Sequence, residues 1–345
     1  MKEVFVEDIK ERDRIDTAFL VTKKEKGVGK SGKPYLSLRL RDRTGELEAR
    51  VWDNAEALGR NFEKDDVVSV KGIAISYQGR IQINVSEIRP LPEGEYSLSD
   101  FLPSSGRDAA QMMAELDGVI AGLRDGHLRA LLTGIFADRE VRERFKIAPA
   151  AKSMHHPYLG GLLEHVLSLC RLGDFVAAHY KGVNRDLLVA GLILHDIGKI
   201  FELRYSRTFG YTDEGRLIGH ITMGADLVDA KIRELQGFPQ ELRMLLKHII
   251  LSHHGQLEYG SPKRPKTLEA LIISYLDDLD AKVNAVQSLV EKDGGEGKWT
   301  EYQRHFERYI YKGRYQMEEA GEEDDADGEE EWGKGKELEL FSNKA

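Results

Sequence analysis

Histidine and aspartate residues recur in a fixed order through the middle of this chain. In order, they are His165, His195, Asp196, His220, His253, His254 and Asp277. Imidazole and carboxylate groups bind first-row divalent metals and leave coordination positions open for water and phosphate. The set therefore indicates a metal centre that can hydrolyse a phosphate ester.

The adjacent pair His195-Asp196 carries most of this argument. It ends an apolar run at residues 187–194, which predicts a buried helix. Burial of an imidazole beside a carboxylate is unfavourable unless something pairs with both groups, and a metal ion would do so. His165 lies in a second apolar segment, residues 160–166, so we expect a second buried helix to contribute a ligand.

This order of residues resembles the HD superfamily of metal-dependent phosphohydrolases, whose signature is His, His-Asp and Asp. The strings His-Asp-Ile-Gly-Lys at 195–199 and Leu-Asp-Asp-Leu-Asp-Ala at 276–281 are typical of it, and the resemblance covers roughly residues 150–290. It implies one ion held by His165, His195, Asp196 and Asp277. It implies a second ion held by His220, His253 and His254, with Asp196 bridging both.

Two ions about 3.5–4 Å apart can clamp a phosphodiester and activate a bridging water. The nitrogen and oxygen ligands suit manganese or iron, with magnesium, cobalt or nickel as alternatives, and we expect two Mn²⁺ ions. The pattern Asp-x-x-Asp-Ala makes Asp277 the ligand that the resemblance implies. Asp278 and Asp280 are expected to be solvated or to contact the ligands.

Catalytic roles are expected for Asp196, Lys199 and His156. Gly198 should end the preceding helix, so that the Lys199 ammonium turns back toward a phosphate oxygen. The alternative for Lys199 is an interaction with the dipole at a helix C-terminus. His155 and His156 precede the first ligand helix, and we expect His155 to contact substrate and His156 to protonate the leaving group. A plain loop role is the alternative for both.

Residues 1–90 predict a separate β-domain. Alternating apolar and polar residues predict strands at 15–21, 34–42, 47–51, 67–75 and 80–88, with a short helix at 54–62. This order, with the Asp42-x-x-Gly45 turn, resembles the OB-fold that many nucleic-acid enzymes carry. The expected fold class is α+β multidomain, with a five-stranded OB-fold barrel followed by an all-α HD domain.

A barrel of this kind binds single strands through a basic groove and stacked aromatic rings. The candidate contacts are Lys24, Lys26, Lys30, Lys33, Tyr35, Arg39, Arg41, Tyr77 and Arg80. The alternative to strand binding is that these charged side chains only face solvent, as the outer residues of a half-exposed sheet normally do. Trp52 is expected in the core. Tyr259 and Arg264, after the His253-His254 pair, are candidate contacts for a base and a phosphate.

The remaining chain divides by composition. Residues 91–107 predict a linker, and residues 108–312 predict the helical domain. We expect its helices at 111–123, 128–145, 161–180, 185–196, 218–235, 240–253, 268–290 and 300–312. No apolar run is long enough for a membrane span, the N-terminus lacks a signal-peptide pattern, and the single cysteine suits a reducing cytoplasm.

The C-terminal segment 313–345 predicts a disordered acidic tail. Residues 318–331 hold ten acidic side chains and no basic one, and without these charges the net charge of −9 becomes +1. Overall acidity therefore does not argue against a nucleic-acid substrate. Within the tail, the run from Leu338 to Phe341 resembles the motif that docks on the bacterial sliding clamp, although it lacks the leading glutamine.

An OB-fold followed by an HD domain of this pattern resembles the YhaM-type 3′→5′ exoribonucleases of bacteria. The resemblance implies hydrolysis of single-stranded RNA from the 3′ end to nucleoside monophosphates, with some activity on single-stranded DNA. One alternative is an HD phosphohydrolase acting on a small nucleotide. Another is a nucleic-acid-binding protein with a non-catalytic HD domain. A homo-oligomer is a further expectation.

Overall fold

The computed structural model of this protein describes residues 2–29, 32–92, 94–152, 156–205 and 209–313. The predictions for Lys30, for His155, and for the tail from residue 314 with its clamp-like segment therefore lie outside the described residues. The chain divides into two compact units, Met1–Leu289 and Val290–Ala345.

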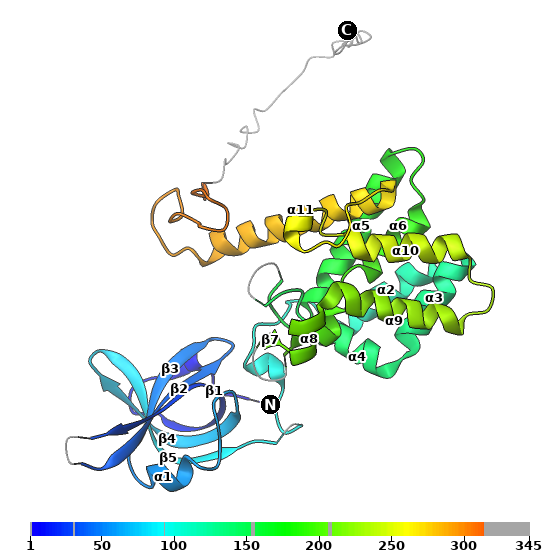
Figure 1. Ribbon diagram of the computed structural model, residues 1–345. Coiled ribbons are helices and arrows are strands. Elements are labelled where there is room, and N and C mark those ends of the chain that lie inside the picture. Colours follow the sequence, from blue (N-terminus) through cyan, green and yellow to red (C-terminus); the bar gives the residue numbers. More distant parts are fainter. Residues whose placement is uncertain (1, 30–31, 93, 153–155, 206–208, 314–345) are drawn as a thin grey trace, which may run out of the picture. The chain divides into compact units, whose positions relative to one another are not determined.

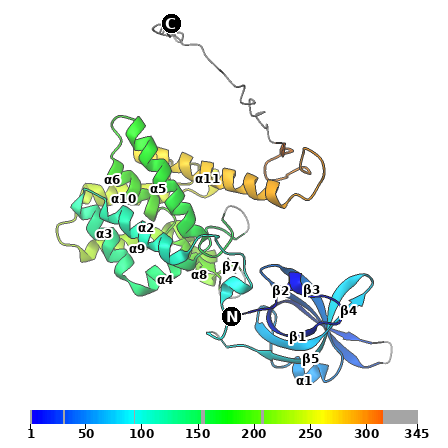
Figure 2. The same cartoon turned by 180° about the vertical axis from the view of Figure 1, so that it is seen from behind.

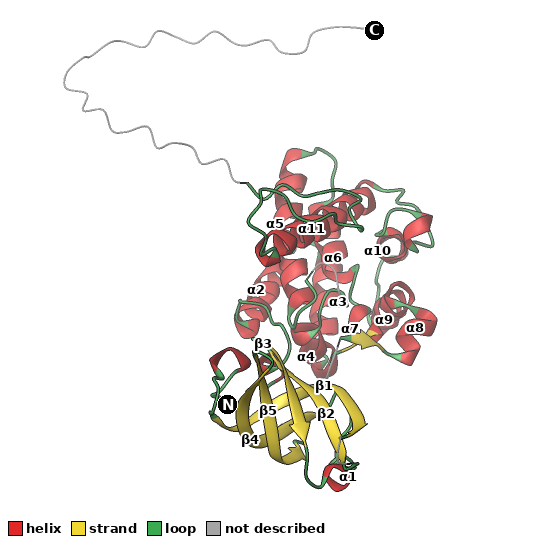
Figure 3. Ribbon diagram, turned by 90° about the vertical axis from the view of Figure 1, so that its left-hand side faces the viewer, coloured by secondary structure: helices red, strands yellow, loops and turns green. Residues whose placement is uncertain are grey.

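The N-terminal strands form a closed barrel, as predicted (Figures 1 and 3). Its strands are β1 (Arg14–Val28), β2 (Pro34–Asp42), β3 (Gly45–Val51), β4 (Val67–Tyr77) and β5 (Arg80–Pro90). They are hydrogen-bonded in the order β1-β2-β3-β5-β4, and β4 pairs with β1 to close the barrel. The β3–β5 pair is parallel and the others are antiparallel. The short helix α1 (Ala55–Leu58) lies between β3 and β4.

Strand alternation decides which side chains fill this barrel. On β2, Leu36, Leu38 and Leu40 are buried, whereas Arg39 and Arg41 between and after them are exposed. The buried set therefore forms one apolar core, and every second residue of the strand remains available on the outer surface.

The helical part begins after η2 (Leu98–Asp100) and is seen from behind in Figure 2. Its helices are α2 (Ala109–Ala121), α3 (Gly126–Ala137), α4 (Arg139–Ile147), α5 (Gly161–His179), α6 (Arg185–Leu194), α7 (Lys199–Glu202), α8 (Asp213–Ile218), α9 (His220–Glu234), α10 (Gln240–Ser252) and α11 (Leu268–Lys292). A two-stranded sheet of β6 (Leu203–Arg204) and β7 (Gly210–Tyr211) follows α7. Helix α6 packs against α5 and α10.

Helix α6 is the central element of this part. Every residue from Asp186 to Leu194 on it is buried, which confirms the buried helix that the apolar run predicts. The helix therefore delivers His195 and Asp196, which follow it directly, into the interior.

Gly198 acts differently from the expectation. Its backbone has φ −64° and ψ −18°, so it does not interrupt the chain through an unusual conformation. Instead, a Cβ atom at this position would lie 2.0 Å from the carbonyl oxygen of His220. The absence of a side chain thus lets the start of α9 approach Asp196 closely. Gly219, with φ +79°, separates α8 from α9, so the predicted helix 218–235 begins at His220.

Two further helix predictions are wrong. The predicted helix 128–145 is divided at Asp138, whose side chain accepts hydrogen bonds from the backbone of Glu140 and Val141 and so caps α4. Aspartate favours this N-cap position over a helix interior. The predicted helix 300–312 is not formed, because bridges join Trp299 with Tyr311 and Gln303 with Arg308. Its aromatic and β-branched residues stabilise paired extended chain better than a helix.

The segment 91–107 is more than an extended spacer, because it contains η2 and buries Phe101 and Leu102. Among the described residues, no helix is both long and apolar enough to cross a lipid bilayer.

We predict that Gly198→Ala lowers the stability of the helical part. The added methyl group would overlap the His220 carbonyl, and such overpacking costs about 1–3 kcal/mol, which lowers the melting temperature by roughly 2–10 °C. Circular dichroism during heating measures this change. Gly118→Ala on α2 is the matched control, because no atom lies within 4 Å of its added Cβ and alanine is the better helix former. Equal melting temperatures for wild type and Gly198→Ala would contradict the prediction.

Candidate metal centre

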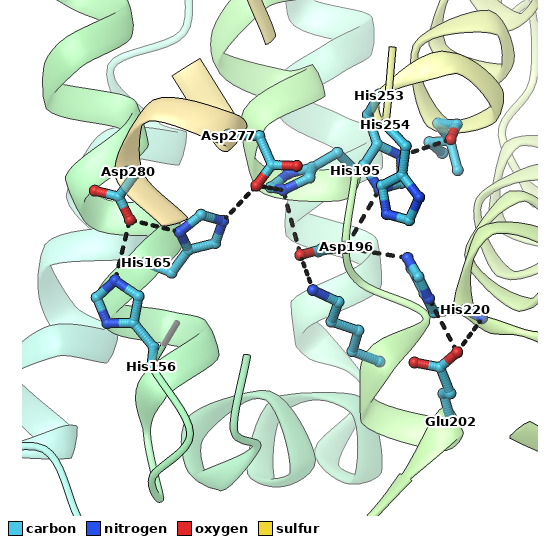
Figure 4. A network of polar contacts seen from close by, with 12 residues as sticks. His156, His165, His195, Asp196, Glu202, His220, His253, His254, Asp277 and Asp280 are labelled. Atoms are coloured by element: carbon cyan, nitrogen blue, oxygen red, sulfur yellow. Dashed lines mark hydrogen bonds and ion pairs between the residues drawn. The ribbon is translucent and has the colours of Figure 1, made fainter. Parts of the chain in front are cut away.

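The first group of predicted ligands meets between α5, α6 and α11 (Figure 4). His165 lies on α5, His195 and Asp196 follow α6, and Asp277 lies on α11. Nε2 of His165 is 3.2 Å and Nε2 of His195 is 3.7 Å from Oδ1 of Asp277. One ligand atom from each of the four residues lies within 4.8 Å of the others, which is close enough for a single ion.

The second group meets on the other side of Asp196. His220 begins α9, and His253 and His254 follow α10. Nε2 of His220 is 3.4 Å and Nε2 of His253 is 3.5 Å from Oδ1 of Asp196. The other oxygen, Oδ2, lies 3.4 Å from Nε2 of His195 in the first group. Asp196 therefore belongs to both groups through different oxygens, and the fold brings all seven predicted ligands together.

The imidazole rings at the helix ends are held by backbone carbonyls. Nδ1 of His195 donates to Leu192 O, Nδ1 of His253 donates to Ile250 O, and Nδ1 of His254 donates to Tyr259 O, each at 2.8 Å. A carbonyl only accepts, so Nδ1 carries the proton of the neutral ring. The Nε2 lone pair then faces the centre, as metal coordination requires.

The other two rings are held by carboxylates. Nδ1 of His165 is 2.7 Å from Oδ2 of Asp280, and Nδ1 of His220 is 3.0 Å from Oε1 of Glu202. The sequence allowed Asp280 to be either a solvated residue or a residue that contacts a metal ligand. In the structure, Asp280 contacts the predicted ligand His165. Sequence reasoning missed Glu202, whose only signal is an acidic side chain one helical turn after Lys199, inside an apolar stretch.

The centre contains buried polar atoms that the protein leaves unsatisfied. Among the described residues, Oδ1 of Asp196 and the Nε2 atoms of His195, His220 and His253 are buried without a hydrogen-bond partner, whereas Oδ2 of Asp196 pairs with the Lys199 ammonium. Each such atom costs about 1–3 kcal/mol if nothing binds it. Divalent ions would satisfy all of them, so the residues fit the metal centre that the sequence predicts.

The charges also favour cations. Burial alone would raise the pKa of Asp196, but the charges of Lys199 and His195 hold it well below its usual value. Burial lowers the pKa of His253 more than Asp196 raises it, so this ring is neutral. At His195 the opposite occurs: burial lowers its pKa, but the carboxylates of Asp196 and Asp277 together outweigh burial and raise the pKa to about 10. An ion must displace that proton, so binding should strengthen as pH rises.

Lys199 lies beside the shared carboxylate. Its Nζ is 2.6 Å from Oδ2 of Asp196, and the side chain is buried. Burial would lower its pKa, but Asp196 and Asp277 raise it, so the ammonium is charged. The ammonium thus turns back toward the centre, as expected, although its contact with a phosphate stays a prediction.

His156 lies on the side of His165 away from Asp196 (Figure 4). Its Nδ1 is 2.5 Å from the Tyr158 hydroxyl, and its Nε2 is 3.0 Å from Oδ2 of Asp280. Both ring nitrogens are therefore engaged. This geometry favours a residue that holds Asp280, and through it His165, over the proton donor that we expected.

On the barrel, Arg39, Tyr77 and Arg80 line one cavity of about 890 Å³. The side chain of Lys24 is only 10% exposed, and its ammonium pairs with Glu63 at 3.0 Å. It is therefore poorly placed to contact a nucleic-acid strand. Arg41 pairs with Glu46 at 2.7 Å. Other candidates on the surface are the exposed Lys26, Lys33, Tyr259 and Arg264.

Trp52 is not in the core, contrary to our expectation. It is 48% exposed and stacks on Tyr35, with ring centroids 4.8 Å apart. The reason is strand alternation, because β3 ends at the inward-facing Val51 and the next side chain points outward. The two rings form an aromatic surface beside Arg50, whose guanidinium is 5.9 Å from the Tyr35 ring.

We predict that chelation destabilises the protein and that Mn²⁺ restores its stability. A ligand at 100 times its dissociation constant adds about 2.7 kcal/mol to the free energy of unfolding. Differential scanning fluorimetry with EDTA and then Mn²⁺ should show a lower and then a higher melting temperature. Asp196→Ala should abolish the Mn²⁺ response. Asp278→Ala should retain it, because Asp278 is exposed and pairs only with Lys282 in the described structure. A full response from Asp196→Ala would contradict the assignment.

The chain matches two known protein families along most of its folded length. Residues 162–282 match the HD domain, and residues 19–91 match the OB-fold nucleic acid binding domain. Part of the chain is also similar to the second OB-fold domain of replication protein A from Methanococcus maripaludis, at 21% identity over 27% of this chain and 94% of that chain, with a TM-score of 0.22.

Two curated relatives are similar over most of their length. The 3′-5′ exoribonuclease YhaM of Geobacillus sp. (strain WCH70) is 35% identical over 281 residues, which is 81% of this chain and 86% of the relative. The 3′-5′ exoribonuclease YhaM of Bacillus subtilis (strain 168) is 36% identical over 281 residues, which is 81% of this chain and 88% of the relative. The identity to these relatives extends over most of the chain, and the chain has an OB-fold domain followed by an HD domain. It therefore belongs to the family of YhaM 3′-5′ exoribonucleases.

Proposed function

We propose that this chain is a metal-dependent 3′→5′ exonuclease that degrades single-stranded RNA to nucleoside 5′-monophosphates. The observation that carries the proposal is the pair of ligand groups joined through the two oxygens of Asp196. Such a centre suits phosphodiester hydrolysis. The names of the two relatives support RNA as the substrate and the 3′ end as the starting point.

Two divalent ions, which we take to be Mn²⁺, would bind the two groups, and when bound they supply Lewis acidity toward phosphate oxygens and acidify a water molecule. The chain's own residues do the rest. Asp280 and Glu202 orient His165 and His220 through their Nδ1 atoms. Lys199 places a buried positive charge beside Asp196, where it can offset the negative charge that develops on phosphorus oxygens.

The net reaction adds water across one bond. The bond between phosphorus and the 3′ oxygen of the penultimate nucleotide breaks, and the hydroxyl group from water joins phosphorus. The 3′ oxygen takes up a proton, so the shortened RNA again ends in a 3′ hydroxyl. We propose a positioning role for His156 in this step rather than proton donation, because both of its ring nitrogens are bonded.

The barrel would hold the strand as it is shortened. The half-buried Tyr35 and the exposed Trp52 provide an aromatic surface, and Arg39, Tyr77 and Arg80 line a cavity on the same barrel. Aromatic stacking and cations together bind single strands with little dependence on sequence. Single-stranded DNA would bind in the same way. We further propose a cytoplasmic location, in line with the single cysteine, and keep the homo-oligomer and the sliding-clamp contact as predictions.

The direct test uses the purified protein with Mn²⁺ and a 5′-labelled single-stranded RNA, beside DNA of the same sequence. We expect a ladder that shortens from the 3′ end, with release of nucleoside monophosphates. Asp196→Ala should lose at least 1,000-fold in rate, since it removes the group that joins both ligand sets, whereas Asp278→Ala should resemble wild type. Cleavage of small nucleotides with no cleavage of either strand would instead favour the small-nucleotide phosphohydrolase.

A second prediction concerns the barrel. Trp52→Ala should raise KM for a long RNA by about 5- to 100-fold with little change in kcat, because a stacked base contributes about 1–3 kcal/mol to binding. Steady-state kinetics on a 20-nucleotide RNA measures both constants. Phe175→Ala, which removes an exposed aromatic ring from α5, is the matched control and should leave KM unchanged. An unchanged KM for Trp52→Ala would remove this surface from the binding path.

A further inference from the structure

A short hairpin follows α11, at residues 298–312 (Figure 1, the orange loop). Antiparallel bridges join Trp299 with Tyr311 and Gln303 with Arg308, and a turn of four residues links the two strands. Between these two bridges the first strand contains one residue more than the second, which is a β-bulge.

One side of the hairpin is packed and anchored. Thr300 is buried, its backbone N–H donates to Ile310 O at 2.9 Å, and its hydroxyl accepts from the Ile310 N–H at 3.1 Å. At the open end, Nζ of Lys312 donates to Oδ1 of Asp293 at 2.8 Å and to Gly295 O at 2.7 Å. The hairpin therefore has a defined shape, and the neighbours of Ile310 along its strand point to the other side.

That other side carries four aromatic rings in two pairs. The ring centroids of Trp299 and Tyr311 are 5.0 Å apart, and those of Tyr302 and Tyr309 are 5.3 Å apart. Tyr309 and Tyr311 flank Ile310, so both point to the same side, and their contacts bring the other two rings there. Each ring is 50–59% exposed. Exposed apolar side chains gathered in this way mark an interaction surface.

Positive charge lies next to these rings. Residues 298–312 contain four lysine or arginine side chains and two glutamates. Arg304 follows Tyr302 by two positions and Arg308 directly precedes Tyr309, and both guanidinium groups are exposed. Within the described part of the chain, neither of them forms an ion pair, although Nε of Arg308 donates to a backbone carbonyl at 2.7 Å. These guanidinium groups can therefore bind an anionic partner.

We propose that the hairpin 298–312 is a second binding surface for single-stranded RNA. Unpaired bases stack on half-exposed aromatic rings, and guanidinium groups bind phosphates. The two ring pairs are about 6.6 Å apart along the second strand, which is twice the rise per residue, so two bases of one strand can stack on different pairs. The inference rests on the proposed exonuclease function and adds to it a surface made by residues of neither the barrel nor the metal centre. Several contacts on one strand raise the affinity beyond that of each contact alone.

The test measures binding of single-stranded RNA to the full-length protein with Mn²⁺. Fluorescence anisotropy follows a 5′-labelled 20-nucleotide RNA with phosphorothioate linkages, which resist hydrolysis during the titration. Trp299→Ala and Tyr309→Ala should each raise the Kd by about 5- to 100-fold, the contribution of one stacked base. Neither should change the Kd of the same RNA in a duplex, because paired bases are not free to stack on a ring.

Conservative variants separate stacking from a structural role. Trp299→Phe and Tyr309→Phe keep a ring at each position, so their Kd values should stay within about 3-fold of wild type. Tyr180→Ala is the matched control and should leave the Kd unchanged. Tyr180 is 58% exposed and contacts the ring of His179, but it lies in the helical part at the end of α5.

The charged side chains give a test that does not depend on the rings. Arg304→Gln and Arg308→Gln change exposed groups, so the hairpin should keep its fold. Each lost phosphate contact should reduce the slope of log Kd against log salt concentration by about 0.7. Circular dichroism during heating compares the folding of all variants. Should Trp299→Ala unfold the hairpin, this slope decides the proposal.

A spectroscopic signal reports on the hairpin directly. The chain contains three tryptophans, Trp52, Trp299 and Trp332. In the double variant Trp52→Phe and Trp332→Phe, only Trp299 fluoresces, and RNA that stacks on it should quench this fluorescence until the site is saturated. Fluorescence that RNA leaves unchanged would contradict stacking at Trp299.

Unchanged Kd values and salt slopes in all hairpin variants would overturn the inference and leave the exonuclease proposal intact. If Trp299→Ala changed only the mass in sedimentation, the rings would instead join two copies of the chain, and the inference would also fail. Absence of shortening from the 3′ end would overturn the exonuclease proposal itself, and the Kd values would then still decide whether the hairpin binds RNA.

Discussion

The carboxylate of Asp196 is the group on which the rest of the helical part depends. It is 1% exposed, and its two oxygens face two different groups of imidazoles. A buried negative charge is tolerated only when positive or donor groups surround it. The fold meets this demand by bringing residues from α5, α9, α10 and α11 around the end of α6, and by turning the Lys199 ammonium to within 2.6 Å.

The geometry of the centre follows from how helices end. The last carbonyls of a helix have no partner within it. His195 and His253 each use the carbonyl three residues earlier, so a ligand that immediately follows a helix is oriented by that helix. His165 and His220 lack such a carbonyl, and Asp280 and Glu202 take its place. His195 and His253 are therefore oriented by the helix that precedes each of them, whereas His165 and His220 are oriented by a carboxylate from another helix.

In the proposed function, the barrel and the helical part divide the work of a nuclease between them. The barrel has its own apolar core and presents aromatic and cationic side chains on its outer surface. The helical part holds the buried polar centre. In the proposed function, affinity for a strand and hydrolysis of its end would thus depend on different residues, which is why a substitution such as Trp52→Ala and one such as Asp196→Ala should have separable effects.

Sequence patterns by themselves determined the barrel, the buried helix before His195 and the seven residues that meet at the centre. Strand alternation and apolar runs are local, and a strict order of His and Asp residues is rare enough to indicate a site. The partners of those residues were decided only by tertiary structure. Glu202 reaches His220 across 18 positions and Asp280 reaches His165 across 115, and no local pattern encodes such contacts.

The errors have the same origin. Trp52 was expected in the core because it is large and apolar, but its place one residue after the inward-facing Val51 directs it outward. Gly198 was expected to end a helix, yet its role is to admit the carbonyl of His220, which approaches from a different helix. The sequence by itself determined which groups can do chemistry. Only the packing of distant helices decided how each group is oriented, because that orientation depends on atoms far away along the chain.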